Sequence, residues 1–141
     1  MNILFMCVAN SARSQLAEGL AREMLGARVT VESAGSHPAQ VNPFAIKALK
    51  EVGIDASKHH SKSYDDLKPG FIATLDYVIT LCAEEVCPQM ASRAKKLHWP
   101  LPDPANQSGT EVEQLNRFRE TRDSIAAKIR NFATENGLTV Y

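Results

Sequence analysis

A cysteine at the end of an apolar, strand-like run constrains this chain more than any other feature. The run Asn2-Ile3-Leu4-Phe5-Met6 leads into Cys7, and a helical pattern begins near Ser14. Open α/β sheets bind ligands outside the carboxyl ends of their strands, which is where this order places the cysteine. The following loop can turn its backbone amides inward, and the helix adds its positive N-terminal end. Such surroundings lower the pKa of a thiol below its free value of roughly 8.5 and make it nucleophilic.

The residues that follow Cys7 form a candidate oxyanion-binding loop. Arg13 supplies a planar fork of donors that matches a tetrahedral oxyanion, and the Ser14 hydroxyl can donate to a thiolate sulfur. The glycines and lysine of a Walker-type phosphate loop are absent. The anion would be held by Val8, Ala9, Asn10, Ser11, Ala12, Arg13 and Ser14. The alternative is a buried core cysteine, with Arg13 solvated in the first turn of the helix.

The Cys7-x5-Arg13-Ser14 loop resembles that of the low-molecular-weight protein tyrosine phosphatases and of the arsenate reductases that share their fold. Within that superfamily the chain is most similar to the thioredoxin-coupled arsenate reductases. The similarity extends to residues 14–19, 32–35, 81–82, 99–105 and 118–125. It implies an α/β three-layer sandwich with a four-stranded parallel sheet. Many relatives carry a second cysteine at the position of Ala12, and its absence removes an off-path disulfide with Cys7.

Alternating strand and helix patterns favour a parallel sheet with helices on both faces. The patterns predict strands at about 3–7, 29–33, 77–81 and 96–99, and helices at about 14–25, 43–52 and 111–135. Asn42-Pro43 and the capping box Thr110-x-x-Glu113 begin the last two helices. The residues predicted to face the core from these two helices are Ile46, Leu49, Val52, Val112, Leu115, Phe118, Ile125, Ile129 and Phe132. A length of 141 residues suits one domain, residues 1–141.

Composition excludes several classes of partner. The formal charge is zero, with 16 basic and 16 acidic residues and no basic block, so we expect no nucleic-acid binding. No apolar run approaches the roughly 20 residues that cross a bilayer, and a strand begins at once, so we expect a cytoplasmic location. We also expect the protein to be a monomer. In that compartment three cysteines indicate catalysis or redox chemistry rather than structural disulfides. The four histidines lack the spacing of metal ligands, so no catalytic metal is expected.

Cys82 and Cys87 form a second cysteine group, directly after the third predicted strand. No further ligands complete a zinc site. Two interpretations are left: a redox pair that relays oxidation away from Cys7, or two cysteines that are simply small buried hydrophobic residues. A helix would hold the two Cα atoms roughly 8–9 Å apart, beyond the ~7 Å limit of a disulfide. We therefore expect residues 82–90 to be a mobile redox segment, with Pro88 keeping Cys87 out of helical geometry.

Asp103-Pro104 lies in a proline-rich loop after the fourth predicted strand, at the same edge of the sheet. The resemblance implies that Asp103 is the general acid that protonates the leaving oxygen, whereas an Asp-Pro alone usually forms a turn. Ala105-Asn106 follows where phosphatases of the superfamily carry aromatic residues, which argues against a phosphotyrosine substrate. The resemblance also allows a structural monovalent cation held by the side chains of Asn10, Glu18 and Ser33.

The resemblance implies that the chain reduces arsenate, with phosphate or sulfate as analogues, to arsenite. Cys7 would attack arsenate, Cys82 would attack the Cys7 sulfur, and Cys87 would leave an oxidised Cys82–Cys87 pair. Thioredoxin, glutaredoxin or a similar thiol would reopen that disulfide, so no bound cofactor is expected. A phosphatase using Cys7, Arg13 and Asp103 is the first alternative, and a non-catalytic oxyanion or redox sensor is the second.

Overall fold

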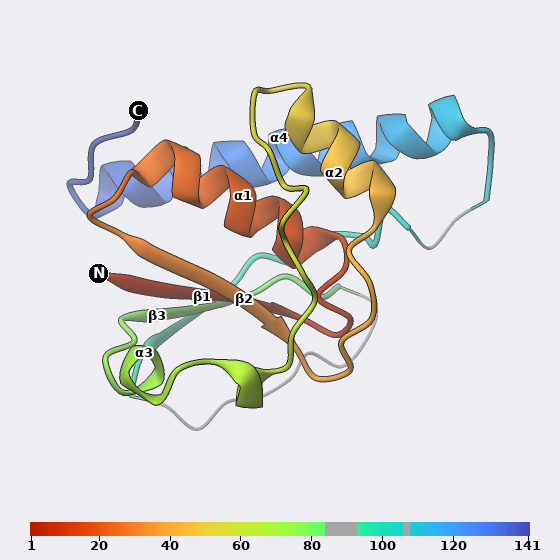
Figure 1. Ribbon diagram of the computed structural model, residues 1–141. Coiled ribbons are helices and arrows are strands. Elements are labelled where there is room, and N and C mark those ends of the chain that lie inside the picture. Colours follow the sequence, from red (N-terminus) through yellow and green to blue (C-terminus); the bar gives the residue numbers. More distant parts are fainter. Residues whose placement is uncertain (84–92, 106–107) are drawn as a thin grey trace.

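A computed structural model of the chain describes residues 1–83, 93–105 and 108–141 (Figure 1). Its strands are β1 (Asn2–Cys7), β2 (Thr30–Gly35), β3 (Tyr77–Thr80) and β4 (Lys95–His98). They form one parallel sheet in the order β2-β1-β3-β4. The predicted four-stranded parallel sheet is therefore confirmed, with small differences at the strand ends.

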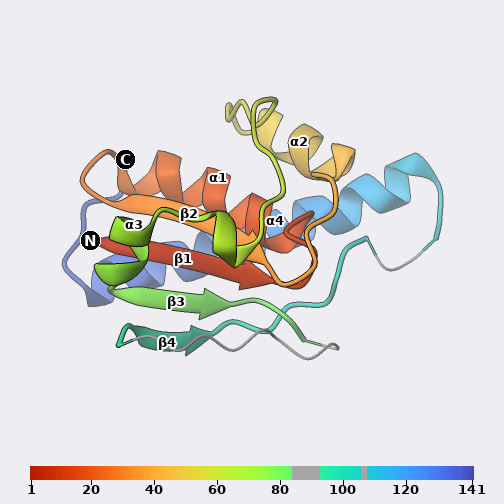
Figure 2. The ribbon, with the colours of Figure 1, turned by 60° about the horizontal axis from the view of Figure 1, so that its bottom comes forward.

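Helices cover the two faces of the sheet unequally (Figures 1 and 2). The longer helices α1 (Arg13–Leu25), α2 (Pro43–Lys50) and α4 (Glu111–Glu135) lie on one face. The short 3-10 helix η1 (Tyr64–Asp66) and α3 (Pro69–Ala73) lie against the other face. The sequence patterns did not predict these two short elements. None of the described helices combines the length and the apolar composition needed to cross a membrane.

Strand β1 is buried on both faces and forms the rigid support of the cysteine at its end. Ile3 and Phe5 pack among the longer helices, while Leu4 and Met6 pack on the opposite face. Alternation of side chains along a strand produces this division. All four side chains are at most 2% exposed. Full burial of each contributes on the order of 1.5–3 kcal/mol, so the position of Cys7 is strongly fixed.

The strand order creates a crevice beside Cys7. After β1 the chain adds β2 on one side and then returns to add β3 on the other side of β1. A reversal of this kind opens a ligand site outside the carboxyl ends of the two strands. At this point the Leu81 amide, just after β3, donates to the Met6 carbonyl at 3.0 Å. Residues that follow Cys7 and residues that follow β3 therefore meet at one edge.

Two local predictions at helix starts are confirmed. The Asn42 side chain accepts a hydrogen bond from the Phe44 amide at 2.9 Å, and Pro43 opens α2. Thr110 and Glu113 form the reciprocal capping box at the start of α4. Both caps depend only on residues within one turn of the chain, which explains why the sequence alone predicts them.

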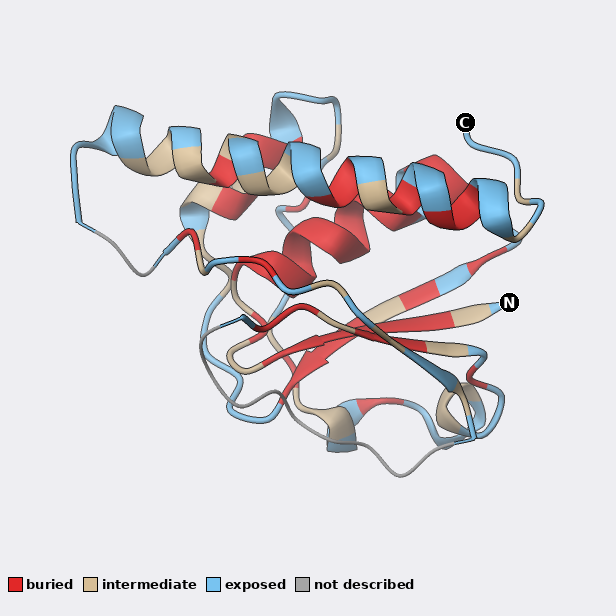
Figure 3. Ribbon diagram, turned by 180° about the vertical axis from the view of Figure 1, so that it is seen from behind, coloured by how far each residue is buried: buried red, intermediate tan, exposed pale blue. Residues whose placement is uncertain are grey.

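Two predicted core positions are wrong, since Val52 is 47% exposed and Val112 is 66% exposed. The helix α2 ends at Lys50, so Val52 lies in the turn that follows and no longer shares the helical face of Leu49. Val112 lies in the first turn of α4, and this N-terminal end of the helix is exposed (Figure 3). Helical periodicity continues into a first turn even where no neighbouring element covers it.

Candidate active site

Cys7 ends β1 and is 3% exposed. Its Sγ atom lies 2.8 Å from Oγ of Ser14, which stands in the first turn of α1. A hydroxyl that donates to sulfur stabilises the thiolate over the thiol, so the contact suits a nucleophile. The predicted partnership between Cys7 and Ser14 is therefore present in the geometry.

The loop after Cys7 has its carbonyl oxygens tied to a neighbouring segment. The carbonyls of Val8, Ala9 and Ser11 accept hydrogen bonds from backbone amides within residues 37–42 at 2.9, 3.1 and 3.0 Å. In the described part of the chain, the amides of residues 9–12 donate to no acceptor. Successive amides left free in this way form a nest that binds an anion.

The start of α1 adds to this nest. Ala12 occupies the N-cap position, where it provides no side-chain hydrogen bond, and the first turn contains no acidic residue. An uncapped N-terminus leaves backbone donors and a positive dipole end for an external anion. Alanine at this position therefore favours oxyanion binding over helix capping.

Asn10 holds the middle of the loop. It is fully buried, and its φ of 48° lies in the left-handed region that asparagine tolerates better than most residues. Its Oδ1 accepts hydrogen bonds from the Lys62 amide and from the Gln15 side chain, each at 3.0 Å. Its Nδ2 donates to the hydroxyls of Ser14 at 2.8 Å and Ser33 at 2.9 Å. These four bonds fix the loop conformation and the Ser14 hydroxyl together.

Arg13 and Asp103 complete the cavity around the thiol. The Arg13 guanidinium donates to the Leu101 carbonyl at 2.8 Å and to the Leu81 carbonyl at 3.4 Å. Its Nη2 lies 4.0 Å from Oδ2 of Asp103, and the side chains are 5% and 30% exposed respectively. The cavity measures about 300 Å³ and is lined by Cys7, Val8, Ala9, Ser11, Ala12, Arg13, Asp103 and Ala105. It therefore unites a thiol, an anion nest, a guanidinium and a partly exposed carboxyl group.

Cys82 follows Leu81 at the same edge of the sheet and is 2% exposed. It is disulfide-bonded, whereas Cys7 is a free thiol. Arg13 connects the two regions, because it stands in the Cys7 loop and donates to the carbonyl adjacent to Cys82. Cys87 lies outside the described residues, as does nearly all of the segment 82–90 for which mobility was predicted.

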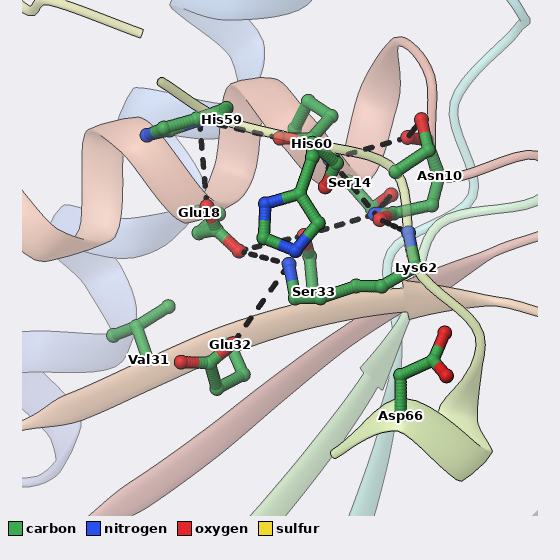
Figure 4. A network of polar contacts seen from close by, with 12 residues as sticks. Asn10, Ser14, Glu18, Val31, Glu32, Ser33, His59, His60, Lys62 and Asp66 are labelled. Atoms are coloured by element: carbon green, nitrogen blue, oxygen red, sulfur yellow. Dashed lines mark hydrogen bonds and ion pairs between the residues drawn. The ribbon is translucent and has the colours of Figure 1, made fainter. Parts of the chain in front are cut away.

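A buried polar network extends from the loop to Glu18 on α1 (Figure 4). The Glu18 side chain is 2% exposed. Its Oε1 accepts from the Ser33 hydroxyl at 2.8 Å and from the Lys62 ammonium at 3.0 Å. Its Oε2 lies 3.3 Å from Arg22 and 3.4 Å from His59. Burial raises the pKa of Glu18, but Lys62 and Arg22 outweigh it and hold that pKa below its ordinary value, so the carboxylate is charged.

This network does not suit the structural cation that the resemblance allowed at Asn10, Glu18 and Ser33. An alkali cation needs several oxygen atoms with free lone pairs. Here the Asn10 oxygen already accepts two N–H groups, and the Ser33 hydroxyl both donates and accepts. The Lys62 ammonium already contacts the Glu18 carboxylate. A positive charge is therefore supplied by the chain itself.

Sequence reasoning missed two residues that shape the site, Lys62 and Gly35. Lysine is rarely buried, so nothing in a single sequence marks Lys62 as an internal residue. Gly35 donates its amide to the Lys62 carbonyl at 3.0 Å and lies directly against the backbone of Val8 and Asn10. The signal for Gly35 was its place two residues after the second predicted strand, where close backbone approach is a common reason for glycine.

Comparison with known proteins agrees with this geometry. The family model of low molecular weight phosphotyrosine protein phosphatase matches residues 2–138. An arsenate reductase of Halalkalibacterium halodurans is 43% identical over 133 residues, which cover 93% of this chain and 94% of that protein. A solved arsenate reductase in a phosphate-binding state superposes with a TM-score of 0.77 at 30% identity, over 95% of this chain and 97% of the other. A thioredoxin-dependent arsenate reductase of Corynebacterium glutamicum gives a TM-score of 0.70 at 30% identity, over 95% of this chain and 60% of the other.

Proposed function

Since the chain belongs to the low molecular weight phosphotyrosine protein phosphatase family, we propose that it uses this fold to reduce arsenate to arsenite. Arsenate binds in the cavity beside Cys7, with its oxygens on the amides of residues 9–12 and on the Arg13 guanidinium. Phosphate and sulfate share its tetrahedral shape and charge, so both are expected to compete for the loop.

The first step forms a bond between the Cys7 sulfur and arsenic. The thiolate attacks, and Asp103, which lines the same cavity, protonates a departing arsenate hydroxyl so that it leaves as water. The Arg13 guanidinium and the loop amides hold the remaining oxygens while negative charge shifts onto them. This step changes no oxidation state.

The second step transfers two electrons. The Cys82 thiolate attacks the Cys7 sulfur, a disulfide forms, and the electron pair of the sulfur–arsenic bond leaves with arsenic as arsenite. Cys87 then attacks the Cys82 sulfur, which releases Cys7 and leaves a Cys82–Cys87 disulfide. A thioredoxin-like dithiol reopens that disulfide, so the thiols supply both electrons and a reducing cytosol suits the reaction.

The position of Cys82 is the observation that carries this proposal. A phosphatase needs only Cys7, Arg13 and Asp103, whereas a reductase also needs a second thiol near the nucleophile. Cys82 is buried at the edge where β1 and β3 end, one residue beyond the carbonyl that Arg13 contacts.

An anaerobic thiol count tests the relay. Fully reduced protein, freed of external thiol, is mixed with excess arsenate and its cysteines are titrated after quenching. We expect the three thiols to fall to one while one equivalent of arsenite is released. The matched variant Cys87→Ser starts with two thiols, and we expect both to disappear as a Cys7–Cys82 disulfide. Survival of all three thiols in the unchanged protein would contradict a self-contained relay.

Substitution of Cys82 by serine separates reduction from phosphatase chemistry. We expect arsenate reduction to fall at least about a hundredfold, because no thiol can attack the Cys7–arsenic intermediate. Hydrolysis of p-nitrophenyl phosphate should stay within about twofold of the unchanged protein, because Cys7, Arg13 and Asp103 remain. Equal loss of both activities would mean that Cys82 supports the cavity rather than the relay.

A further inference from the structure

A continuous chain of side-chain contacts connects the nucleophile to a buried carboxylate on α1, and Figure 4 shows the part of it from Ser14 to Glu18. The Cys7 sulfur lies 2.8 Å from the Ser14 hydroxyl, which accepts from Asn10 at 2.8 Å. Asn10 also donates to Ser33 at 2.9 Å, and Ser33 donates to Glu18 at 2.8 Å. The charge balance at Glu18 therefore bears on the same loop that presents Cys7.

Lys62 contacts this chain at two separate points. Its ammonium lies 3.0 Å from the Glu18 carboxylate, and its backbone amide donates to the Asn10 side chain at 3.0 Å. Its side chain is 10% exposed, so the ion pair is largely shielded from water. Lys62 thus holds both the charged end of the network and the left-handed residue of the loop.

The other basic groups around Glu18 neutralise it less well. Arg22 is 43% exposed, so water screens its charge, whereas the Lys62 side chain is only 10% exposed. Both cations also face Glu32, Arg22 at 3.1 Å and Lys62 at 3.8 Å. Burial lowers the pKa of His59 below its ordinary value although Glu18 opposes this shift, so His59 is mostly neutral at pH 7. Lys62 is therefore the shielded positive charge at this carboxylate.

We propose that the Lys62 ammonium acts as a built-in counter-cation for the Glu18 carboxylate and thereby positions the Cys7 loop. The inference rests on the proposed role of Cys7 as nucleophile. Removal of this ammonium leaves a buried carboxylate poorly compensated, and a buried charge that loses its partner is strongly destabilising. The network would then reorganise, and the Ser14 and Asn10 contacts that hold Cys7 ready would weaken.

The reactivity of Cys7 tests the proposal without any arsenate chemistry. Alkylation by iodoacetamide is followed by mass spectrometry on the tryptic peptide 1–13, which contains Cys7 and neither of the other cysteines. We expect Lys62→Met to slow alkylation at pH 7 about tenfold and Lys62→Arg to recover most of the rate, because it restores the charge. Lys68→Met is the control. Lys62 and Lys68 both line a cavity of about 370 Å³ beside Glu18, but Lys68 pairs with no acidic residue in the described part of the chain.

A second pair of measurements keeps the test decisive if Lys62→Met unfolds. In the double variant Glu18→Gln/Lys62→Met both charges are gone, and we expect it to fold and to alkylate within about threefold of the unchanged protein. We also expect alkylation of the unchanged protein to be the same in KCl, NaCl and choline chloride at equal ionic strength. Alkylation of Lys62→Met at the unchanged rate, or strong stimulation of the unchanged protein by potassium, would overturn the proposal. A failed thiol count with these results intact would reject arsenate reduction alone.

Discussion

Replacing Cys7 by serine is expected to abolish arsenate reduction, with a fall of at least about a thousandfold. A serine hydroxyl stays protonated at neutral pH, and it can form neither the sulfur–arsenic bond nor the disulfide that releases arsenite. The substitution is nearly isosteric, so the loop amides and Arg13 should still hold an anion. The measurement is the rate of arsenite formation with a thiol reductant, together with calorimetric titration of phosphate.

The two readouts distinguish loss of the nucleophile from loss of the site. We expect phosphate affinity in Cys7→Ser to stay within a few-fold of that of the unchanged protein, because the binding groups come from other residues. Arsenite formation above about one per cent of the original rate would place the nucleophile elsewhere. Cys82→Ser is the matched control in hydrolysis of p-nitrophenyl phosphate, which we expect it to retain and Cys7→Ser to lose, because only Cys7→Ser removes the nucleophile.

Substitution of Gly35 by alanine is expected to have the second largest effect, through the shape of the loop. A Cβ atom at Gly35 would lie 2.4 Å from the Val8 carbonyl oxygen and 2.9 Å from the Asn10 amide nitrogen. Both atoms belong to the backbone of the anion-binding loop, so no side chain can rotate to make room. The methyl group must push β2 and the loop apart, and we expect a loss of about 3 kcal/mol in the free energy of unfolding.

Urea denaturation and phosphate binding measure this effect. We expect the Gly35→Ala loop to bind phosphate at least about tenfold more weakly, because its amides no longer converge. Gly70→Ala is the matched control, because a Cβ atom there meets no atom within 4 Å, and Gly70 lies within the short helix α3. An unchanged urea midpoint and phosphate affinity in Gly35→Ala would show that the loop and β2 are less tightly packed than their atomic contacts indicate.

The residues within one strand–loop–helix unit could be predicted because their roles follow from short-range order. Cys7, Arg13 and Ser14 lie within eight positions of one another, and the structure places all three around the start of α1. The caps at Asn42 and Thr110 were predicted for the same reason. The exposure of Val52 and Val112 could not be predicted, because burial depends on which neighbouring elements reach a position.

The sequence by itself determined the parallel α/β sheet, the cysteine at the end of its first strand and the loop that can hold an oxyanion, because periodicity and local spacing encode these features. Only the tertiary structure decided what surrounds them. Lys62 reaches Glu18 across 44 positions of sequence, and Asp103 reaches Arg13 from the loop after β4. Contacts of that range depend on how the chain crosses the sheet, and no local pattern records which charged group is carried into the interior.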